Sequence, residues 1–300
     1  MTPRPAAGPG QGPGKALERP GQGPGKGRER AGKGEGPNMP KSHANSIAVH
    51  FEVTGAGPPL VLIHAIPFDN TLWLYQAAHF STWFTVVSVD LRGWGRSEKV
   101  TTPFTLEDIC RDVLGVMDDL GLGPAVVMGC SIGSKTALML GALFPDRFRA
   151  VIQVGGNSGP QDMSRRITGY REEQFSPYRR AHMDYGVTDG FAASVLGKYL
   201  FAGFAERDRR HHPAAIIRTF EALAAADLRP HLAAYPLPTL IINGEFDGAR
   251  PRGAETASLI PQARHEVLPG AGHACMIEDP AGFDALVLDF LREEGLMPEI

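Results

Sequence analysis

The sequence predicts an α/β protein whose mainly parallel central sheet is flanked by helices and carries a helical lid insert. Three observations lead to this prediction: short apolar segments recur along the chain, helical patterns separate them, and one long stretch interrupts the alternation. Parallel strands need crossover connections, which are usually helices, and a sheet built in this way is covered on both faces.

The expected strands are short segments rich in Val, Ile, Leu and Thr. The first alternates apolar and polar residues, as a half-buried strand does, whereas most of the others are continuous apolar runs typical of fully buried strands. They comprise residues 47–54, 59–65, 85–91, 125–129, 150–154, 239–243 and 265–268.

Helical patterns lie between or after these strands. Residues 105–120 carry acidic side chains in their first turn and end before Gly121. Residues 134–144 are rich in Ala, Leu and Met and end before a proline, while residues 280–291 begin at one. Acidic side chains and proline are both favoured in the first turn of a helix, whereas proline is disfavoured in the helix interior. We therefore expect helices at these three places.

The alternation stops between Gly155 and Pro236. Residues 159–236 contain no strand-like apolar run, and Arg, Ala and Tyr recur there at helical spacing. This segment leaves the sheet at the carboxyl end of a strand, which is the edge where open α/β sheets bind ligands. We expect a helical cap over a binding cleft, with packing against a side face as the alternative. The predicted core comprises residues 39–158 and 237–300.

The first 38 residues differ in composition from the rest of the chain. They contain 11 Gly and 7 Pro but no Val, Ile, Phe, Trp or Tyr. Such a segment buries too little apolar surface to offset the entropy lost on ordering it. Residues 1–38 are therefore predicted to be a disordered extension, and their excess of Lys and Arg leaves open a contact with an anionic partner.

Composition and charge argue against several classes of function. A net charge of −3 lacks the basic excess of a general nucleic-acid binder. No apolar run reaches the roughly 18 residues of a membrane span. The three cysteines form no CxxC pair, and no ligand spacing typical of zinc occurs. We expect a cytoplasmic protein that acts on a small molecule without a metal ion or cofactor, and without a nucleic-acid or membrane partner.

The clearest indication of catalytic chemistry in the sequence is a Gly-x-Ser-x-Gly pentapeptide. It comprises residues 129–133, with Ser131 at its centre, between a predicted strand and a predicted helix. In this context the pattern predicts a nucleophile elbow, whose strained turn raises the serine hydroxyl above the sheet edge. Small residues are needed at both glycine positions because larger side chains would collide with the strand or the helix.

Asp247 and His273 complete a candidate catalytic triad. Each follows a predicted strand, so both are expected at the sheet edge that holds Ser131. His273 would accept the proton of Ser131, and Asp247 would orient the imidazole and stabilise the imidazolium. The order Ser, Asp, His along the chain is the one used with such an elbow. Glu245 is the alternative acid.

Together with these residues, several motifs resemble the α/β-hydrolase superfamily over residues 46–295. Residues 64–67 (HAIP) are similar to the family's His-Gly-x motif. Residues 90–97 (DLRGWGRS) are similar to its Asp-x-Arg-Gly-x-Gly-x-Ser turn. Residues 145–147 (PDR) and the Gly-His pair within residues 272–280 match two further habits of the family. The resemblance implies the fold and acyl-transfer chemistry.

The resemblance also implies an oxyanion hole and a class of substrate. The oxyanion hole would consist of the backbone N–H groups of Ile66 and Ile132, with Ala65 in place of the family's usual glycine. The chain is similar to the capped serine esterases, enol-lactonases and cofactor-free haloperoxidases. A small carboxylic ester or lactone, cleaved through an acyl-enzyme, is therefore the implied substrate.

Three alternatives stay open. Carbon–carbon bond hydrolases of the family usually carry Gly-Pro-Gly after the His-Gly pair, which residues 66–69 (IPFD) lack. An acyltransferase would use the same catalytic residues with an acceptor other than water. A ligand receptor would keep the pocket with little or no turnover.

If residues 159–236 cover the site, their apolar side chains should line the acyl pocket. The segment holds 11 Lys and Arg against 9 Asp and Glu, a small basic excess that is compatible with an anionic substrate, with a solvated surface as the alternative role of these charges. The candidate pocket residues are Phe175, Tyr178, Met183, Tyr185, Phe191, Leu196 and Phe201.

Overall fold

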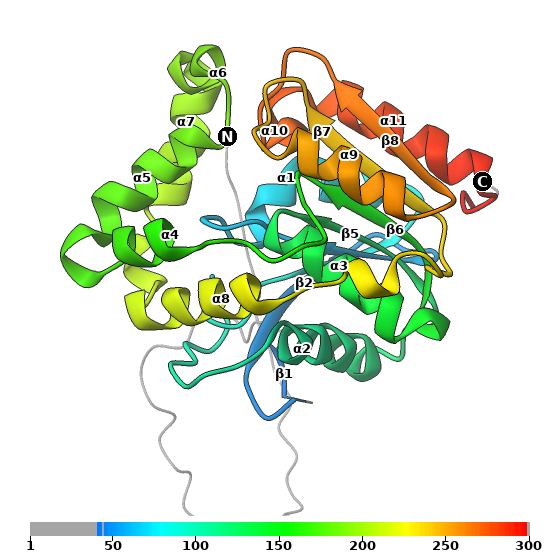
Figure 1. Cartoon of the computed structure of the whole chain (residues 1–300), viewed down its shortest axis with the longest axis horizontal. Helices are drawn as coiled ribbons and strands as arrows, with labels where there is room; N and C mark the ends of the chain where they lie inside the picture. Colours follow the sequence, from blue (N-terminus) through cyan, green and yellow to red (C-terminus); the bar gives the residue numbers. More distant parts are fainter. Residues whose placement is uncertain (1–40, 44, 299–300) are drawn as a thin grey trace, which may run out of the picture. The chain divides into compact units, whose positions relative to one another are not determined.

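An eight-stranded sheet forms the centre of the fold in the computed structural model (Figure 1), which describes residues 41–43 and 45–298. Its strand order is β1-β2-β4-β3-β5-β6-β7-β8. Strand β2 runs antiparallel to β1 and β4, and every other neighbouring pair is parallel. The predicted α/β class with a mainly parallel sheet is confirmed. The predicted extension, residues 1–38, lies outside the described residues.

Strands β2 to β8 coincide with the apolar segments that the sequence predicts, and the short β1 is added at the edge. The strands are β1 (Lys41–Ser42), β2 (Val49–Thr54), β3 (Pro59–Ile63), β4 (Thr85–Val89), β5 (Ala125–Cys130), β6 (Phe148–Val154), β7 (Thr239–Gly244) and β8 (Ala263–Leu268).

Helices connect the strands, and no helix in the described ranges is long and apolar enough to cross a membrane. The α-helices are α1 (Leu74–Phe80), α2 (Leu106–Asp119), α3 (Ile132–Leu143), α4 (Ser164–Gly169), α5 (Phe175–Tyr185), α6 (Asp189–Ala193), α7 (Val195–Ala205), α8 (Pro213–Ala225), α9 (Arg250–Leu259), α10 (Cys275–Glu278) and α11 (Pro280–Glu293). The 3-10 helices are η1 (Asn70–Trp73), η2 (Pro145–Arg147), η3 (Glu172–Gln174), η4 (Asp208–Arg210) and η5 (Arg229–His231).

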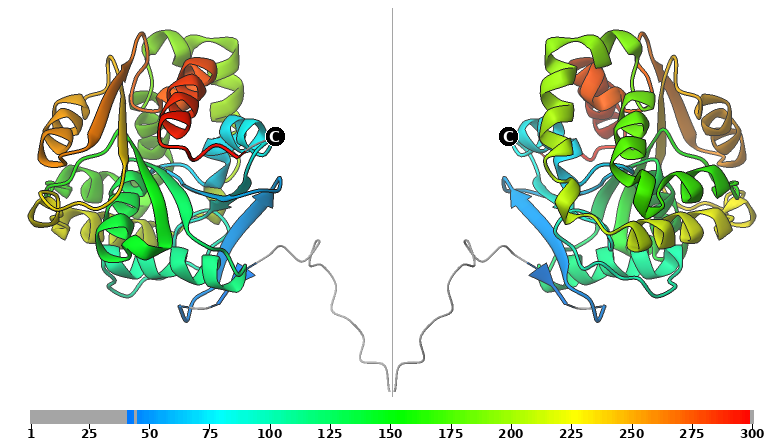
Figure 2. Two further views of the ribbon diagram at one scale, coloured as in Figure 1. Left: turned by 90° about the vertical axis from the view of Figure 1, so that its right-hand side faces the viewer. Right: turned by 90° about the vertical axis from the view of Figure 1, so that its left-hand side faces the viewer.

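Apolar layers cover both faces of the sheet. Leu60 and Leu62 of β3 belong to one buried cluster, whereas Val61 and Ile63 belong to the other. Successive strand residues point to opposite faces, so a continuous apolar run requires helices on both sides. Helices α2 and α3 contribute to one cluster and α1 and α11 to the other, which gives the layered arrangement visible in Figure 2.

Helix α2 begins where the sequence provides a capping box. The hydroxyl of Thr105 accepts a hydrogen bond from the N–H of Asp108, and the Asp108 carboxylate accepts one from the N–H of Thr105. The pair satisfies backbone donors that a helix start leaves free. Ile109, Val113 and Val116 then form the apolar stripe that packs onto the sheet.

The chain leaves the sheet after β6 and returns to it at β7. Between these strands it forms helices α4 to α8, which lie beside the sheet in Figure 1 (green to yellow). Tyr170 lies among these helices, and its ring contacts Phe175, Tyr178 and Phe220. This stretch is helical, as the sequence predicts. The boundaries 159–236 and its role as a lid stay predictions.

Candidate active site

Ser131 occupies the sharp turn between β5 and α3. Its backbone φ of 55° and ψ of −109° lie in a region that residues other than glycine rarely adopt. A Cβ atom at Gly129 would lie 2.0 Å from the carbonyl oxygen of Gly133, and one at Gly133 would lie 2.2 Å from that of Ile63. Both glycine positions of the pentapeptide therefore exclude any larger residue.

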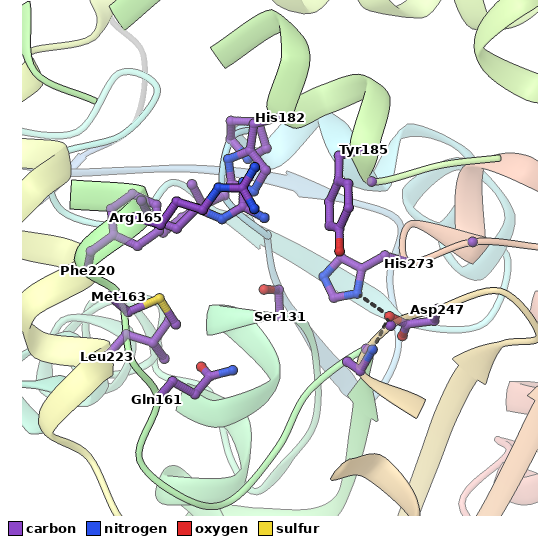
Figure 3. Close-up of a pocket in the computed structure, with 18 of the residues that line it drawn as sticks. Ser131, Gln161, Met163, Arg165, His182, Tyr185, Phe220, Leu223, Asp247 and His273 are labelled. Carbon is purple, nitrogen blue, oxygen red and sulfur yellow. Dashed lines mark hydrogen bonds and ion pairs between the residues drawn. The ribbon is translucent and has the colours of Figure 1, made fainter. Parts of the chain in front are cut away.

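Hydrogen bonds hold this turn in place. The N–H of Ser131 donates to the carbonyl of Val154 on β6 over 2.8 Å, and the Ser134 hydroxyl donates to the carbonyl of Ser131 over 2.6 Å. The strained backbone is thus anchored to the sheet on one side and to the first turn of α3 on the other. Figure 3 shows the Ser131 hydroxyl lying in a cavity, with His273 on the same side.

An acid–imidazole pair lines the same cavity as this serine, and its two residues follow β7 and β8. Nδ1–H of His273 donates to Oδ1 of Asp247 over 2.9 Å. The other carboxylate oxygen of Asp247 accepts from the side-chain amide of Asn243 over 2.8 Å, and Oδ1 also accepts from the N–H of Ala249 over 2.8 Å. Three donors therefore hold the carboxylate in one orientation.

The electrostatics of this pair favour the ionised acid. Burial raises the pKa of Asp247, but the charge and hydrogen bond of His273 and the donors from Ala249 and Asn243 outweigh burial and bring that pKa to about 2. Burial likewise lowers the pKa of His273, and the Asp247 carboxylate more than offsets this, so the pKa of His273 is raised. An imidazolium is therefore stabilised beside Asp247.

Glu245, the alternative acid of the sequence analysis, lies away from His273. Its carboxylate accepts the N–H of Gly270 over 2.9 Å, and its side chain is exposed. Glu245 therefore stabilises the turn after β8 and does not orient the imidazole of His273.

Gly155, which sequence reasoning missed, shapes the space around His273. It follows β6 with φ 58°, and a Cβ atom there would lie 2.8 Å from Nδ1 and Cε1 of the imidazole. The ring thus rests against the backbone at the end of β6, and any side chain would displace it. The Gly155-Gly156 pair directly after an apolar strand was the available signal.

The two amides expected to form an oxyanion hole come from neighbouring parts of the fold. Ile132 is the first residue of α3, where backbone N–H groups have no intrahelical partner, and Ile66 follows β3 and lines the cavity. A Cβ atom at Gly133 would lie 2.8 Å from the carbonyl oxygen of His64. The start of α3 therefore packs directly on the loop that carries Ile66.

His64 fixes this loop rather than facing the cavity. It is fully buried, its Nε2 accepts the N–H of Leu91 over 3.0 Å, and its Nδ1 lies 3.0 Å from the carbonyl oxygen of Ala65. Burial lowers the pKa of His64, which keeps the ring neutral so that one nitrogen accepts and the other donates. Ala65 fits in place of glycine and is itself buried.

A cavity of about 740 Å³ opens above Ser131 and has walls from the sheet edge and from the helical segment. The sheet side includes Ile66, Gly155, Asp247 and His273. The helical side combines apolar and polar side chains, several of them visible in Figure 3: Gln161, Met163, Arg165, Arg166, Tyr178, His182, Tyr185, Phe220 and Leu223.

Only two of the seven pocket residues expected in the helical segment, Tyr178 and Tyr185, line this cavity. The other five do not line it. Phe175 and Met183 are buried in the two hydrophobic clusters, and Phe191 and Phe201 contact each other between α6 and α7. Leu196 is exposed. An apolar residue at helical spacing faces whichever neighbour its helix packs against, or solvent. The predicted pocket residues Phe175, Met183, Phe191 and Phe201 therefore pack on other parts of the fold, and Leu196 is exposed to solvent.

The apolar wall comes instead from residues that sequence reasoning did not select. Met163 precedes α4, and Phe220 and Leu223 lie three residues apart on α8. That spacing places both on one helix face and was the available signal. Within the described ranges no group of three or more His, Cys, Asp or Glu residues could hold a metal ion.

Comparisons with known proteins agree with this geometry. A model of the alpha/beta hydrolase fold matches residues 58–280. The 3-oxoadipate enol-lactonase 2 of Acinetobacter baylyi is 28% identical over 257 residues, which cover 81% of this chain and 93% of the relative.

Two further similarities span most of the chain. The 2-hydroxy-6-oxononadienedioate/2-hydroxy-6-oxononatrienedioate hydrolase of Burkholderia vietnamiensis is 28% identical over 267 residues, or 82% of this chain and 91% of the relative. The crystal structure of the enol-lactonase from Burkholderia xenovorans is 29% identical and has a TM-score of 0.79, covering 84% of this chain and all of that one. With an elbow serine, an acid–imidazole pair and a family match over most of its length, this chain is a hydrolase that belongs to the alpha/beta hydrolase fold family.

Proposed function

We propose that this hydrolase cleaves a small carboxylic ester or lactone through an acyl-enzyme intermediate. One observation carries the proposal: Ser131, at a strained elbow, shares a cavity with a His273–Asp247 pair whose carboxylate is held by three donors. The similarity to two enol-lactonases supports the substrate class, because a lactone is an internal ester and needs the same chemistry.

Acylation begins with attack of the Ser131 hydroxyl oxygen on the substrate carbonyl carbon. Nε2 of His273 accepts the hydroxyl proton, and the adjacent Asp247 carboxylate stabilises the imidazolium that forms. The low pKa of Asp247 keeps this carboxylate ionised throughout. The proton on Nε2 then passes to the leaving alkoxide, which departs as an alcohol or, for a lactone, stays attached to the acyl group as a hydroxyl.

The negative charge of the tetrahedral intermediate falls on the former carbonyl oxygen. We assign its stabilisation to the backbone N–H groups of Ile66 and Ile132, and the packing of the start of α3 on the loop after β3 supports this assignment. Preorganised donors of this kind contribute on the order of 10²-fold or more each to the rate.

Deacylation repeats these steps with water as the nucleophile. His273 accepts a proton from the water, whose oxygen attacks the acyl carbon, and then returns the proton to the Ser131 oxygen as the acid departs. The same residues would serve an acyltransferase if an alcohol or thiol replaced the water.

We further propose that the segment of residues 159–236 acts as the lid of this site. Support comes from the cavity wall, where Met163, Tyr178, Tyr185, Phe220 and Leu223 all belong to that segment. An apolar wall on the cap side would hold the acyl chain and restrict the access of water.

Labelling by a fluorophosphonate, followed by hydrolysis assays, tests the proposal. Wild-type protein should be labelled at Ser131 and should hydrolyse members of a panel of 4-nitrophenyl esters and simple lactones. Ser131→Ala should do neither, whereas Ser258→Ala, which changes an exposed serine of α9, should behave as wild type. Absence of both labelling and hydrolysis in the wild type would favour a ligand receptor and contradict the proposal.

Two assays separate the remaining reactions. The similarity to the Burkholderia vietnamiensis enzyme favours carbon–carbon bond hydrolysis as a second candidate, which a 2-hydroxy-6-oxodienoate substrate would reveal. Adding an alcohol acceptor to the ester assay and measuring the yield of new ester reveals acyl transfer. Turnover of the dienoate well above that of every ester and lactone would replace our proposal.

A further inference from the structure

The cavity wall carries positive charge that is not paired with any carboxylate whose side chain the structure describes. Arg165 and Arg166 of α4 and Arg252 of α9 all line the cavity. None of the ion pairs among the side chains that the structure describes, those of residues 41–43, 45–171 and 173–298, includes any of these three arginines. By contrast, Arg179 and Arg229, which belong to the helical segment of residues 159–236, are paired with aspartates.

The two acidic side chains in the cavity wall are already engaged. Asp247 binds His273, and the carboxylate of Asp162 accepts the backbone N–H of Ser164 over 2.9 Å. Asp162 is also exposed. The wall therefore offers cationic donors that have no acidic partner among the described side chains, and Arg165 lies across the cavity from His273 and Asp247 in Figure 3.

A neutral donor lies beside the arginines. His182 of α5 lines the cavity, and its Nδ1 lies 2.7 Å from the hydroxyl of Tyr170. Burial lowers the pKa of His182 well below its ordinary value and raises the pKa of Tyr170, so the imidazole is neutral and the phenol protonated. The phenol has no other hydrogen-bond partner among the described residues, so it donates to Nδ1. The remaining nitrogen, Nε2, then carries the hydrogen and is the donor left for a ligand.

Arg166 links this cluster to the catalytic end of the cavity. Its guanidinium carbon lies 5.4 Å from the centre of the Tyr185 ring, a cation–π contact. In Figure 3 the hydroxyl end of Tyr185 points towards His273. The positive charge of Arg166 acts against protonation of both His182 and His273, although for His273 the Asp247 carboxylate outweighs it and the pKa stays raised. The field of Arg166 therefore reaches both histidines of the cavity.

We propose that Arg165, Arg166 and Nε2–H of His182 form an anion subsite, and that the substrate is an ester or lactone that carries a carboxylate away from the scissile bond. This inference rests on the proposed function and adds the substrate class to it. A carboxylate takes two parallel hydrogen bonds from a guanidinium and would neutralise the unpaired charge of the wall. Arg166 is the principal specificity residue because it contacts both the cavity and Tyr185.

Matched pairs of esters test the subsite. Mono-4-nitrophenyl adipate differs from 4-nitrophenyl hexanoate in that a carboxylate replaces the terminal methyl group. Half-esters of glutarate and suberate, each compared with its neutral counterpart, vary the distance between the scissile ester and the carboxylate. For at least one length, we expect kcat/KM to be about 10- to 100-fold higher for the anionic ester, as expected for a charge-assisted hydrogen bond. Arg166→Gln should remove most of this preference, and Arg166→Lys should restore part of it.

Arg180→Gln is the matched control. Arg180 lies on α5, is exposed, has no ion pair among the described residues and does not line the cavity, so its loss should leave the preference intact. A second readout separates a specific role from a structural one. Removing the charge of Arg166 should raise the pKa of His273 and move the acidic limb of the kcat/KM profile to higher pH.

Binding to Ser131→Ala tests the subsite without turnover. Calorimetry should show that adipate, glutarate or suberate binds at least about 10-fold more tightly than the diol of the same length, and that adding Arg166→Gln to this variant abolishes the difference. Equal affinity of diacids and diols at all three lengths would overturn the subsite, as would equal kcat/KM within every ester pair. If the wild type instead binds diacids through Arg166 but hydrolyses no ester, the subsite stands and the proposed function fails.

Discussion

Ser131 shows how a single residue can be held in an unfavourable backbone conformation by its surroundings. Its positive φ costs about 1–3 kcal/mol for a non-glycine residue. The turn is maintained by a hydrogen bond from Ser131 to Val154 and by one from Ser134 to Ser131. The close contacts of Gly129 and Gly133 also maintain it. In this conformation the hydroxyl lies in the cavity.

The first prediction concerns the three proposed catalytic residues. Ser131→Ala and His273→Ala should each reduce kcat by about 10⁴-fold or more, because members of a triad act as a unit. Asp247→Asn should reduce kcat by a somewhat smaller factor, since the imidazole is still present but lacks the carboxylate charge that orients it. Steady-state kinetics with a 4-nitrophenyl ester gives these values, and unchanged melting temperatures would confirm that folding is intact.

Glu245→Gln is the control for the acid. It changes a carboxylate that binds the N–H of Gly270, so we expect kcat within about threefold of the wild type. A larger loss in Glu245→Gln than in Asp247→Asn would show that our assignment of the acid is wrong.

The second prediction follows from the direction of the His273 pKa. The base must be neutral to accept a proton, and Asp247 raises its pKa, so kcat/KM should fall as the pH decreases through that raised value. In Asp247→Asn the attraction of the carboxylate for the imidazolium is lost, and the acidic limb should move to lower pH. A pH profile of residual activity in this variant measures the shift, and a limb that stays in place would contradict the pairing.

At the scale of elements, helix α3 joins the sheet to the helical segment. Lys135, one turn after Ser131, is fully buried, and its Nζ donates to the carbonyls of Gly159 over 2.5 Å and of Leu223 over 3.5 Å. Burial lowers the pKa of Lys135 to about 8. The ammonium thus connects the nucleophile helix to both the start of the segment and α8.

The third prediction concerns this connection. Lys135→Met leaves two carbonyls without their donor, so it should lower the free energy of unfolding by about 1–3 kcal/mol. Chemical denaturation would measure the loss. Lys198→Met, which changes an exposed lysine of α7, should have little effect, and an equal loss in both variants would argue that Lys135 has no special role.

The fourth prediction concerns the wall of the proposed lid. Tyr185 lines the cavity and is 73% exposed, so Tyr185→Ala should shift the preferred acyl length while leaving stability nearly unchanged. The expected change in discrimination is about 1–3 kcal/mol per methylene. Measuring kcat/KM from acetate to octanoate esters tests it.

Phe201→Ala is the matched control for Tyr185→Ala. Phe201 packs against Phe191 and the apolar cluster instead of lining the cavity, so its loss should lower the melting temperature without changing the ranking of the esters. If Phe201→Ala altered the ranking and Tyr185→Ala did not, the cavity wall would be assigned incorrectly.

At the scale of the whole molecule, the parallel sheet brings the proposed catalytic residues to one of its edges. Ser131, Asp247 and His273 follow β5, β7 and β8, and all three strands run in the same direction. Their carboxyl ends therefore meet at one edge, although the residues are up to 142 positions apart in the sequence. The helical segment enters and leaves the sheet between β6 and β7, and it contributes the other wall of the cavity.

The fifth prediction concerns the whole chain. Removing residues 1–38 should leave the melting temperature and kcat unchanged, because their sequence provides no aromatic or β-branched aliphatic anchor. Calorimetry and ester hydrolysis of the shortened protein test this. A fall of more than a few degrees would mean that these residues pack on the folded domain.

Local patterns predicted most of the sheet and missed elements that lack a pattern. Buried parallel strands are continuous apolar runs, which made β3 to β7 recognisable, whereas the antiparallel β2 was recognisable from its alternation of apolar and polar residues. Helix α9 (RPRGAETASL) has no apolar stripe, and β1 has only two residues, so neither carries a periodic signal. Helix α1 has only seven residues, too few for a clear helical period.

The sequence by itself determined the fold class, the elbow around Ser131 and the position of Asp247 and His273 after strands, because strand periodicity, glycine spacing and chain order are local properties. Only the tertiary structure decided which side chains surround the substrate. Met183 and Tyr185 are two residues apart on α5, yet one is buried in the core and the other lines the cavity. Likewise, Arg165 and Arg166 resemble many surface arginines until the packing of α4 places them in the cavity wall, where no described carboxylate is paired with them. Helical spacing tells which residues are apolar or charged, but the angle at which a helix packs on its neighbours determines what each one contacts.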